Sequence, residues 1–209
     1  MMDLCRQRLL CGLQALGLLL SESQIEALLN FVQLIEKWNK AYNLTAVREP
    51  SEMIGLHLLD SLAILPHLKS PRIADIGTGA GLPGIPLAIC RPDCHFTLID
   101  SNSKKTRFVQ QVILELKLKN VDVEHARVET FRPQWLFDSV LARAFTDMPE
   151  MIRLTRHLLA VEGVLLAMKG QAPVKELAEL GVGYEVIPLA VPGIEAERCL
   201  IRIERAPNA

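Results

Sequence analysis

The sequence lacks the cysteine pattern of a disulfide framework or of a structural zinc site. Its 5 cysteines are odd in number, and none of them forms a C-x-x-C pair. Disulfides are rare in the reducing cytoplasm, and zinc sites of small domains usually use such pairs. We therefore expect a cytoplasmic protein that contains neither a disulfide framework nor zinc.

A strong excess of positive charge is also missing. The formal net charge is −1 at pH 7, from 23 Lys and Arg against 24 Asp and Glu. Proteins that hold nucleic acid chiefly by neutralising phosphates carry a large positive balance. Any binding of RNA must therefore depend on a local basic face.

No segment reaches the roughly 20 apolar residues that a membrane-spanning helix requires. The best candidate runs from Leu9 to Leu20, but Gln14 and Gly17 interrupt it. Cys11 lies near the start of this run, whereas the cysteine of a lipoprotein cleavage box follows its apolar run. A buried amphipathic helix explains the run, and we expect no membrane association.

Several enzyme motifs are absent as well. The sequence contains neither a G-x-S-x-G elbow nor a Walker sequence, which disfavours the usual hydrolase and phosphoryl-transfer classes. The 5 histidines show no spacing that would place two of them on one helical face with a carboxylate. No metal site is predicted.

The first third of the chain has the apolar spacing of helices. Residues 3 to about 40 predict two packed helices, the second beginning at a capping box of Ser23 and Glu26. A further short helix is predicted over residues 52–65. Together these segments form a predicted helical extension over residues 1–70, packed on the rest of the chain.

From Arg72 onward, short apolar runs alternate with helical segments, as in βαβ units around a parallel sheet. The predicted strands lie near residues 72–76, 95–100, 121–125, 138–143, 163–168, 183–189 and 198–204. The predicted helices lie near residues 84–90, 104–117, 147–160 and 172–180. Because no helix separates the last two strands, we expect an antiparallel hairpin at one sheet edge. The fold class is α/β, with a seven-stranded, mostly parallel sheet in a domain over residues 71–209.

The strongest motif is glycine-rich and lies where the first strand turns into the first helix. It reads Asp75-Ile76-Gly77-Thr78-Gly79-Ala80-Gly81-Leu82-Pro83-Gly84. Glycines at such a turn allow positive φ and close approach of a ligand. The motif also satisfies G-x-G-x-x-G, so a nicotinamide or flavin site is one interpretation.

Two features of this turn favour S-adenosylmethionine over a dinucleotide. Pro83 and Pro86 remove two N–H donors from the helix start that would face a pyrophosphate. Asp75 would repel a pyrophosphate but suits the ammonium or sulfonium end of S-adenosylmethionine. The closing hairpin, which a plain dinucleotide fold does not need, is a third argument.

Asp100 is the second candidate ligand of this cofactor. It ends a predicted strand about 20 residues beyond the glycines, where a carboxylate can accept hydrogen bonds from ribose hydroxyls. The alternative is that Asp100 caps the helix that starts near Ser103.

Cationic residues follow three successive strands. Arg127, Arg143 and Lys169 stand where the carboxyl ends of parallel strands meet, at the edge where open α/β sheets bind ligands. Each could be a solvated end of a strand, but together they indicate a site for an anionic polymer or a transferred group. Lys104, Lys105 and Arg107 open a helix, where the dipole disfavours cations, so they indicate phosphate contact or solvated surface.

Separated blocks along nearly the whole chain occur in the order of one family. They are Trp38 to Thr45, His57 with Asp60-Ser61, Asp75 to Pro86, Arg127-Val128-Glu129, Arg143-Ala144-Phe145 and Met168-Lys169-Gly170. On these blocks the sequence resembles the bacterial 16S ribosomal RNA guanine-N7 methyltransferase family, also called the glucose-inhibited division protein B family. Ala142, where serine is expected, is a small change beside them.

The resemblance implies a Rossmann-like class I S-adenosylmethionine-dependent methyltransferase fold. It implies methyl transfer to guanine 527, in the 530 loop of the bacterial small ribosomal subunit. The cofactor ligands that it implies are Gly77, Leu82, Val128, Glu129 and Arg143, to which the motif adds Asp75, Gly79 and Asp100. The catalytic candidates are Lys169 and Arg143, and the RNA-binding candidates are Arg127, Lys104, Lys105 and Arg107.

The chemistry of this target agrees with the residues present. Guanine N7 has a lone pair and no proton to remove, so attack on a sulfonium methyl needs alignment rather than a general base. A cation on N7 would block the reaction, so Lys169 or Arg143 is assigned to guanine O6 or to phosphate.

Other functions stay open from the sequence. The chain could methylate another RNA site, a small molecule or a protein, or it could be a nicotinamide oxidoreductase or a non-catalytic RNA-binding module. The expected partner is 16S rRNA within the 30S subunit, and the expected state is a monomer.

Overall fold

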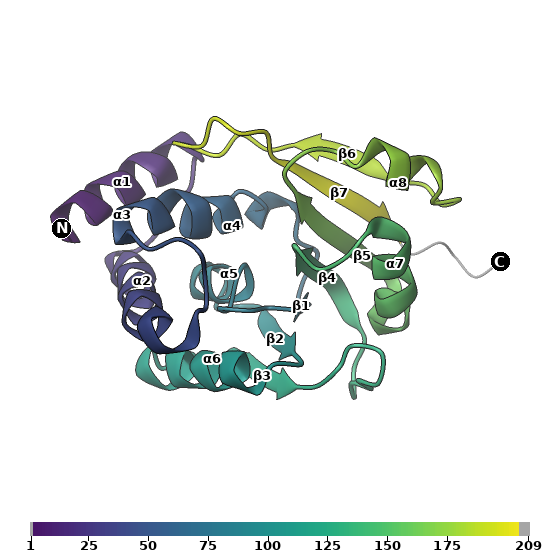
Figure 1. The fold of residues 1–209 in the computed structure, drawn as a ribbon, viewed down its shortest axis with the longest axis horizontal. Helices are drawn as coiled ribbons and strands as arrows, with labels where there is room; N and C mark the ends of the chain where they lie inside the picture. Colours follow the sequence, from purple (N-terminus) through teal and green to yellow (C-terminus); the bar gives the residue numbers. More distant parts are fainter. Residues whose placement is uncertain (1, 205–209) are drawn as a thin grey trace.

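The computed structural model describes residues 2–204 as a seven-stranded sheet with helices on both faces (Figure 1). Met1 and residues 205–209, which belong to the two predicted regions, lie outside the described residues. Within residues 2–204, no helix is both long and apolar enough to cross a membrane.

The first third of the chain is helical, as predicted. Its elements are α1 (Met2–Ala15), α2 (Glu22–Tyr42), α3 (Pro50–Met53), a π-helical segment η1 (Ile54–Leu59), α4 (Asp60–Leu62) and a short 3-10 turn η2 (Leu65–His67). The short helix predicted over residues 52–65 is therefore a composite with a wide π turn in its middle.

The predicted start of α2 was wrong by two residues. Ser21, not Ser23, is the N-cap, and its side chain accepts a hydrogen bond from the backbone N–H of Gln24. The Gln24 side chain in turn accepts one from the Ser21 backbone N–H at 2.9 Å, which completes a capping box. Glutamine serves in this box as well as glutamate does, so the same motif occurs in an earlier register.

The remaining elements alternate as a parallel α/β fold requires. They are β1 (Arg72–Ile76), α5 (Gly84–Cys90), β2 (His95–Asp100), α6 (Ser103–Glu115), β3 (Val121–His125), β4 (Phe137–Arg143), α7 (Met148–Thr155), a 3-10 turn η3 (Arg156–Leu158), β5 (Leu159–Lys169), α8 (Val174–Ala178), β6 (Glu185–Pro188) and β7 (Cys199–Glu204). The strand order is β3-β2-β1-β4-β5-β7-β6.

The sheet confirms the predicted topology. β1 to β5 pair in parallel, whereas β7 runs antiparallel between β5 and β6 at one end of the sheet. The strand order reverses between β1 and β4, where ligands of open α/β sheets bind beyond the carboxyl ends of the strands.

Two predicted helices are too long. The helix predicted over residues 147–160 ends at Thr155, because β5 begins at Leu159 and pairs with Phe137 of β4. A register shift then brings Val164 opposite Ser139. The helix predicted over residues 172–180 is restricted to α8, which has one buried residue, Leu177.

Apolar side chains form a core on each face of the sheet. Figure 1 shows α1 to α6 gathered on one side and α7 with α8 on the other. The helical region and the first face share one buried cluster, which includes Leu9, Phe31, Leu58 and Phe108. Each fully buried side chain of this size contributes about 1.5–3 kcal/mol. The boundary between residues 70 and 71 stays a prediction.

Candidate active site

The glycine-rich turn adopts the backbone that its sequence predicts. Gly77, Gly79 and Gly81 have φ angles of +66°, +60° and +81°, a region that side chains with a Cβ rarely occupy. The backbone N–H of Gly77 donates to the carbonyl of Ile99 at 2.8 Å. A Cβ on Gly77 would lie 2.8 Å from Cδ2 of Phe145, so the turn passes directly beside that ring.

Asp75 lies beneath the turn and is completely buried. Its Oδ2 accepts hydrogen bonds from the Thr78 hydroxyl at 2.6 Å and from the backbone N–H of Gly84 at 2.9 Å. Its Oδ1 is buried without a hydrogen-bond partner among the described residues. Burial raises the pKa of Asp75 to about 6, and these two hydrogen bonds offset part of the effect. The carboxylate therefore ties the turn to α5, and its contact with a cofactor stays a prediction.

The start of α5 does not offer the free N–H groups of a pyrophosphate site. Gly84 donates to Asp75, and the N–H of Ile85 donates to the Gly81 carbonyl at 2.8 Å. Pro86 has no N–H. This arrangement disfavours the dinucleotide interpretation of the glycine motif.

Asp100 holds the turn against the end of β2. Its Oδ2 accepts a hydrogen bond from the Gly79 N–H at 2.9 Å, and its Oδ1 accepts one from the Asn102 N–H at 2.8 Å. The cap of α6 is Asn102, whose side chain accepts from the Lys104 N–H at 3.0 Å. The alternative role of Asp100 as the helix cap is therefore wrong.

A cavity of about 270 Å³, here called the turn cavity, opens beside the glycine turn. It is lined by Gly77, Ile99, Asp100, Ser101, Lys105, Ala126, Arg127, Val128, Glu129, Ala144 and Phe145. These residues come from the carboxyl ends of β1 to β4 and from the start of α6. The fold thus brings together four of the predicted cofactor ligands: Gly77, Asp100, Val128 and Glu129.

A second cavity of about 480 Å³, here called the strand-end cavity, lies beyond the ends of β4 and β5. It shares Ala144 with the turn cavity. Arg143 and Lys169, the two catalytic candidates, both line it. The Lys169 ammonium donates to the Thr146 carbonyl at 2.9 Å and lies 3.9 Å from Glu176.

The helical region supplies the opposite wall of the strand-end cavity. Thr45, His57 and Asp60 line it together with the strand residues. His57 is buried, its Nε2 lies 3.0 Å from the Thr45 hydroxyl, and burial lowers its pKa to about 4. His57 is therefore neutral at pH 7. The π turn of η1 carries His57, and such turns are frequent at functional sites.

Asp60 forms an ion-paired cluster with two arginines. Its Oδ2 is 3.1 Å from Nη1 of Arg143, and its Oδ1 is 3.1 Å from Nε of Arg198. Burial raises the pKa of Asp60, and the two guanidinium groups offset part of that rise. Two cations against one carboxylate leave this cluster with a positive charge in excess.

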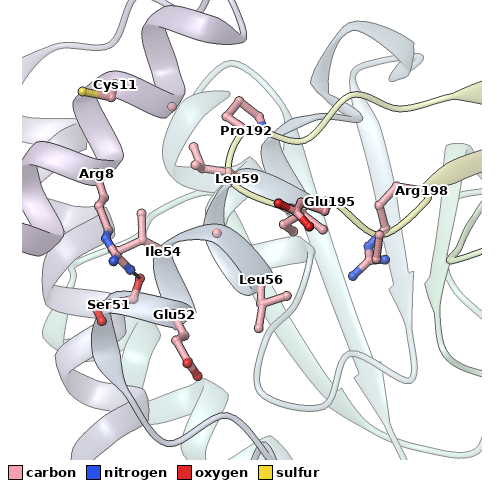
Figure 2. Close-up of a pocket in the computed structure, with 15 residues that line it drawn as sticks. Arg8, Cys11, Ser51, Glu52, Ile54, Leu56, Leu59, Pro192, Glu195 and Arg198 are labelled. Atoms are coloured by element: carbon pink, nitrogen blue, oxygen red, sulfur yellow. Dashed lines mark hydrogen bonds between the residues drawn. The ribbon is translucent and has the colours of Figure 1, made fainter.

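A third cavity of about 800 Å³, here called the groove, borders this cluster on the side of the helical region (Figure 2). Arg198 and Leu56 belong to both this groove and the strand-end cavity. In Figure 2, Arg8 of α1 donates to the Ser51 carbonyl at one side, and Arg198 lies at the other. The groove also carries Glu52 and Glu195, so its charge is mixed.

Other predicted residues line neither the turn cavity nor the strand-end cavity. Leu82 is buried in the core, and Lys104 and Arg107 are exposed on α6. Their predicted roles in binding cofactor and RNA stay predictions. Among residues 2–204, no group of three or more His, Cys, Asp and Glu side chains is placed to hold a metal ion.

Asp60, Arg198 and Phe145 have no role predicted from the sequence. Asp60 and Phe145 stand in the blocks that carry the family resemblance, so that signal was present. Arg198 is 138 residues from Asp60, and no local spacing relates the two.

Comparison with known sequences identifies one family. The profile described as rRNA small subunit methyltransferase G (GidB) matches residues 24–198. Ribosomal RNA small subunit methyltransferase G of Chromobacterium violaceum is 50% identical over 196 residues, covering 92% of this chain and 94% of that protein. The protein of the same name from Laribacter hongkongensis is 49% identical over 201 residues, covering 95% and 97%.

Comparison with solved structures supports the fold. A putative S-adenosylmethionine-dependent methyltransferase from Methanococcus maripaludis has a TM-score of 0.60 at 14% identity, covering 85% of this chain and 93% of that chain. A methyltransferase from Aquifex aeolicus that depends on the same cofactor has a TM-score of 0.57 at 16% identity, covering 76% and 94%. At these identities the likeness concerns the class I methyltransferase fold alone.

Proposed function

The chain belongs to the rRNA small subunit methyltransferase G family, and from this premise we propose that it methylates N7 of a single guanine in 16S rRNA. It is an S-adenosylmethionine-dependent rRNA methyltransferase. The proposal adds the acceptor atom and the position, guanine 527 of the 530 loop. The observation that carries it is the group of cations around the strand-end cavity, directly beside the turn cavity.

The turn cavity fits the adenosine part of S-adenosylmethionine. Gly77 leaves space that a Cβ would take, next to the Phe145 ring. Asp100 and Glu129 supply carboxylates suited to ribose hydroxyls, and Val128 supplies a buried apolar wall. Together with Arg143, these residues would hold the cofactor, which when bound supplies an electrophilic methyl group on sulfur.

The strand-end cavity suits an acceptor that needs no general base. Burial lowers the pKa of His57 to about 4, which makes it a weak base, and both oxygens of Asp60 are bound by arginines. N7 of guanine has no proton to lose, so catalysis here consists of orienting the base and excluding water. Lys169 and Arg143 supply donors for guanine O6 or for phosphate.

The test uses 30S subunits from a strain that lacks this methyl group. Incubation with wild-type protein and S-adenosylmethionine should produce one guanine that borohydride and aniline cleave, because N7 methylation leaves a positive charge on the ring. The single-turnover rate should vary little between about pH 6.5 and 8.5, because no catalytic base titrates there. Lys169→Met should lower this rate while S-adenosylmethionine affinity, measured by titration calorimetry, stays near wild type.

Each alternative has its own outcome. Methylated RNA that resists aniline, or a rate that rises about tenfold per pH unit, would indicate a different acceptor atom that requires a base. Cleavage at another guanine would keep the chemistry and change the position. Methyl transfer to a small molecule, with 30S subunits left unmodified, would overturn the assignment of the substrate.

A further inference from the structure

Asp60 occupies an unusual place for a carboxylate. It begins α4 directly after the π turn of η1, and it is 5% exposed. Each of its two oxygens binds a different arginine at 3.1 Å: Arg143 at the end of β4 and Arg198 just before β7. One side chain of the helical region therefore fixes two cations from the sheet domain.

Stability alone does not account for this arrangement. The free-energy cost of removing charged groups from water is about as large as the free energy gained from their attraction. An apolar cluster of similar volume would therefore stabilise the fold equally well. The guanidinium groups are also not sealed in the core, since the Arg143 and Arg198 side chains are 23% and 24% exposed. Both line the strand-end cavity, where the substrate base is proposed to enter.

Both arginines keep donors for a further partner. Arg143 uses Nη1 for Asp60 and for the Leu56 carbonyl. Arg198 uses Nε for Asp60 and Nη1 for the Glu197 carbonyl. Within residues 2–204, Nη2 of either arginine makes no hydrogen bond. Arg198 also borders the adjoining groove, so it stands where one cavity meets the next (Figure 2).

We propose that Asp60 is a positioning residue for the RNA substrate. Asp60 holds Arg143 and Arg198 so that their remaining N–H donors meet the acceptor oxygens of the target nucleotide. This inference rests on the proposed function. A free arginine has many rotamers, and a guanidinium held on one edge presents its remaining donors without that entropic cost. The charge on Asp60 matters for this role, because a neutral amide binds a guanidinium more weakly.

The test is a double-mutant cycle on methyl transfer to 30S subunits. Asp60→Asn keeps the side-chain shape and removes the charge, and Arg198→Met removes one of its partners. At saturating S-adenosylmethionine, so that any effect on cofactor binding through Arg143 does not contribute, each should lower kcat/KM for 30S subunits by about tenfold. Both changes remove the same interaction, between Asp60 and Arg198. The kcat/KM of the double variant should therefore lie within about threefold of that of the less active single variant. Asp138→Asn is the matched control, because Asp138 pairs with Arg72 at the opposite end of the sheet.

A merely structural role predicts different results. Losses that multiply to roughly a hundredfold in the double variant would overturn the proposal, as would Asp60→Asn activity within about threefold of wild type. Should Asp60→Asn fail to fold, Asp60→Glu replaces it in the cycle, because it keeps the charge and displaces both arginines.

If wild type and Asp138→Asn leave 30S subunits unmethylated, the proposed function fails and this inference fails with it. If both methylate 30S subunits and Asp60→Asn does so equally well, the inference alone fails.

Discussion

Gly77 combines two requirements in one residue. Its φ is +66°, and a Cβ at this position would lie 2.8 Å from the Phe145 ring. Gly77→Val should therefore strain the backbone and displace the Phe145 ring, which lines the turn cavity. We expect its affinity for S-adenosylmethionine to fall more than about tenfold in titration calorimetry, with a stability loss of about 1–3 kcal/mol.

Gly181→Val separates strain from the site. Gly181 has a φ of +60°, and no heavy atom lies within 4 Å of the place that a Cβ would take. It should lose similar stability and bind S-adenosylmethionine normally. Equal affinities in the two variants would contradict the role of Gly77.

Asp75 makes stability depend on pH. Its pKa is about 6 in the folded protein, above its usual value of 3.8, so the folded state binds the proton more tightly than the unfolded chain. This residue therefore lowers the free energy of unfolding as pH rises from about 4 to 6, by up to about 3 kcal/mol. In urea unfolding, the stability of Asp75→Asn relative to wild type should rise over this range. A relative stability that stays constant from pH 4 to 7 would exclude the raised pKa.

The start of α2 tests how a single helix is stabilised. Ser21 accepts the Gln24 N–H in the capping box, whereas Ser23 lies within the first turn. Ser21→Ala should cost about 1 kcal/mol in thermal or urea unfolding, and Ser23→Ala should stay within about 0.5 kcal/mol of wild type. The reverse order would restore the register predicted from the sequence.

The composite helix of residues 50–62 has a local geometry that apolar spacing does not reveal. Its π turn brings His57 to the wall of the strand-end cavity, and Asp60 follows directly. Apolar spacing predicts a helix here, but it does not distinguish an α turn from a π turn. The wider turn packs against α1.

The cofactor should stabilise the protein as a whole. S-adenosylmethionine and S-adenosylhomocysteine should raise the melting temperature in differential scanning fluorimetry, whereas NAD and ATP should not. A ligand that binds the native state contributes about 2.7 kcal/mol when its free concentration is roughly 100 times Kd. Equal stabilisation by NAD would contradict the conclusion, drawn from the start of α5, that the glycine turn does not form a dinucleotide site.

Local sequence patterns were sufficient to predict the class of fold and several of the residues that line the turn cavity. Alternating apolar runs indicated the parallel strands and the closing hairpin, because burial on a sheet face imposes a short period on the sequence. The glycine turn, Asp100 and the strand-end cations were also predicted, since in a parallel sheet all strands end at one edge. These features depend on residues that are close in sequence or repeat once per strand.

Features that join distant segments of the chain depend on how the elements pack and were not predicted from the sequence. The ion-paired cluster joins Asp60 to partners 83 and 138 residues away, and the strand-end cavity takes one wall from the helical region. Asp75 lies beneath the turn, where Thr78 and Gly84 donate to its Oδ2, and its contact with a cofactor stays a prediction. Local patterns record which residues can form an element. Which side chains meet across elements depends on how the elements pack, and no spacing along the chain encodes that.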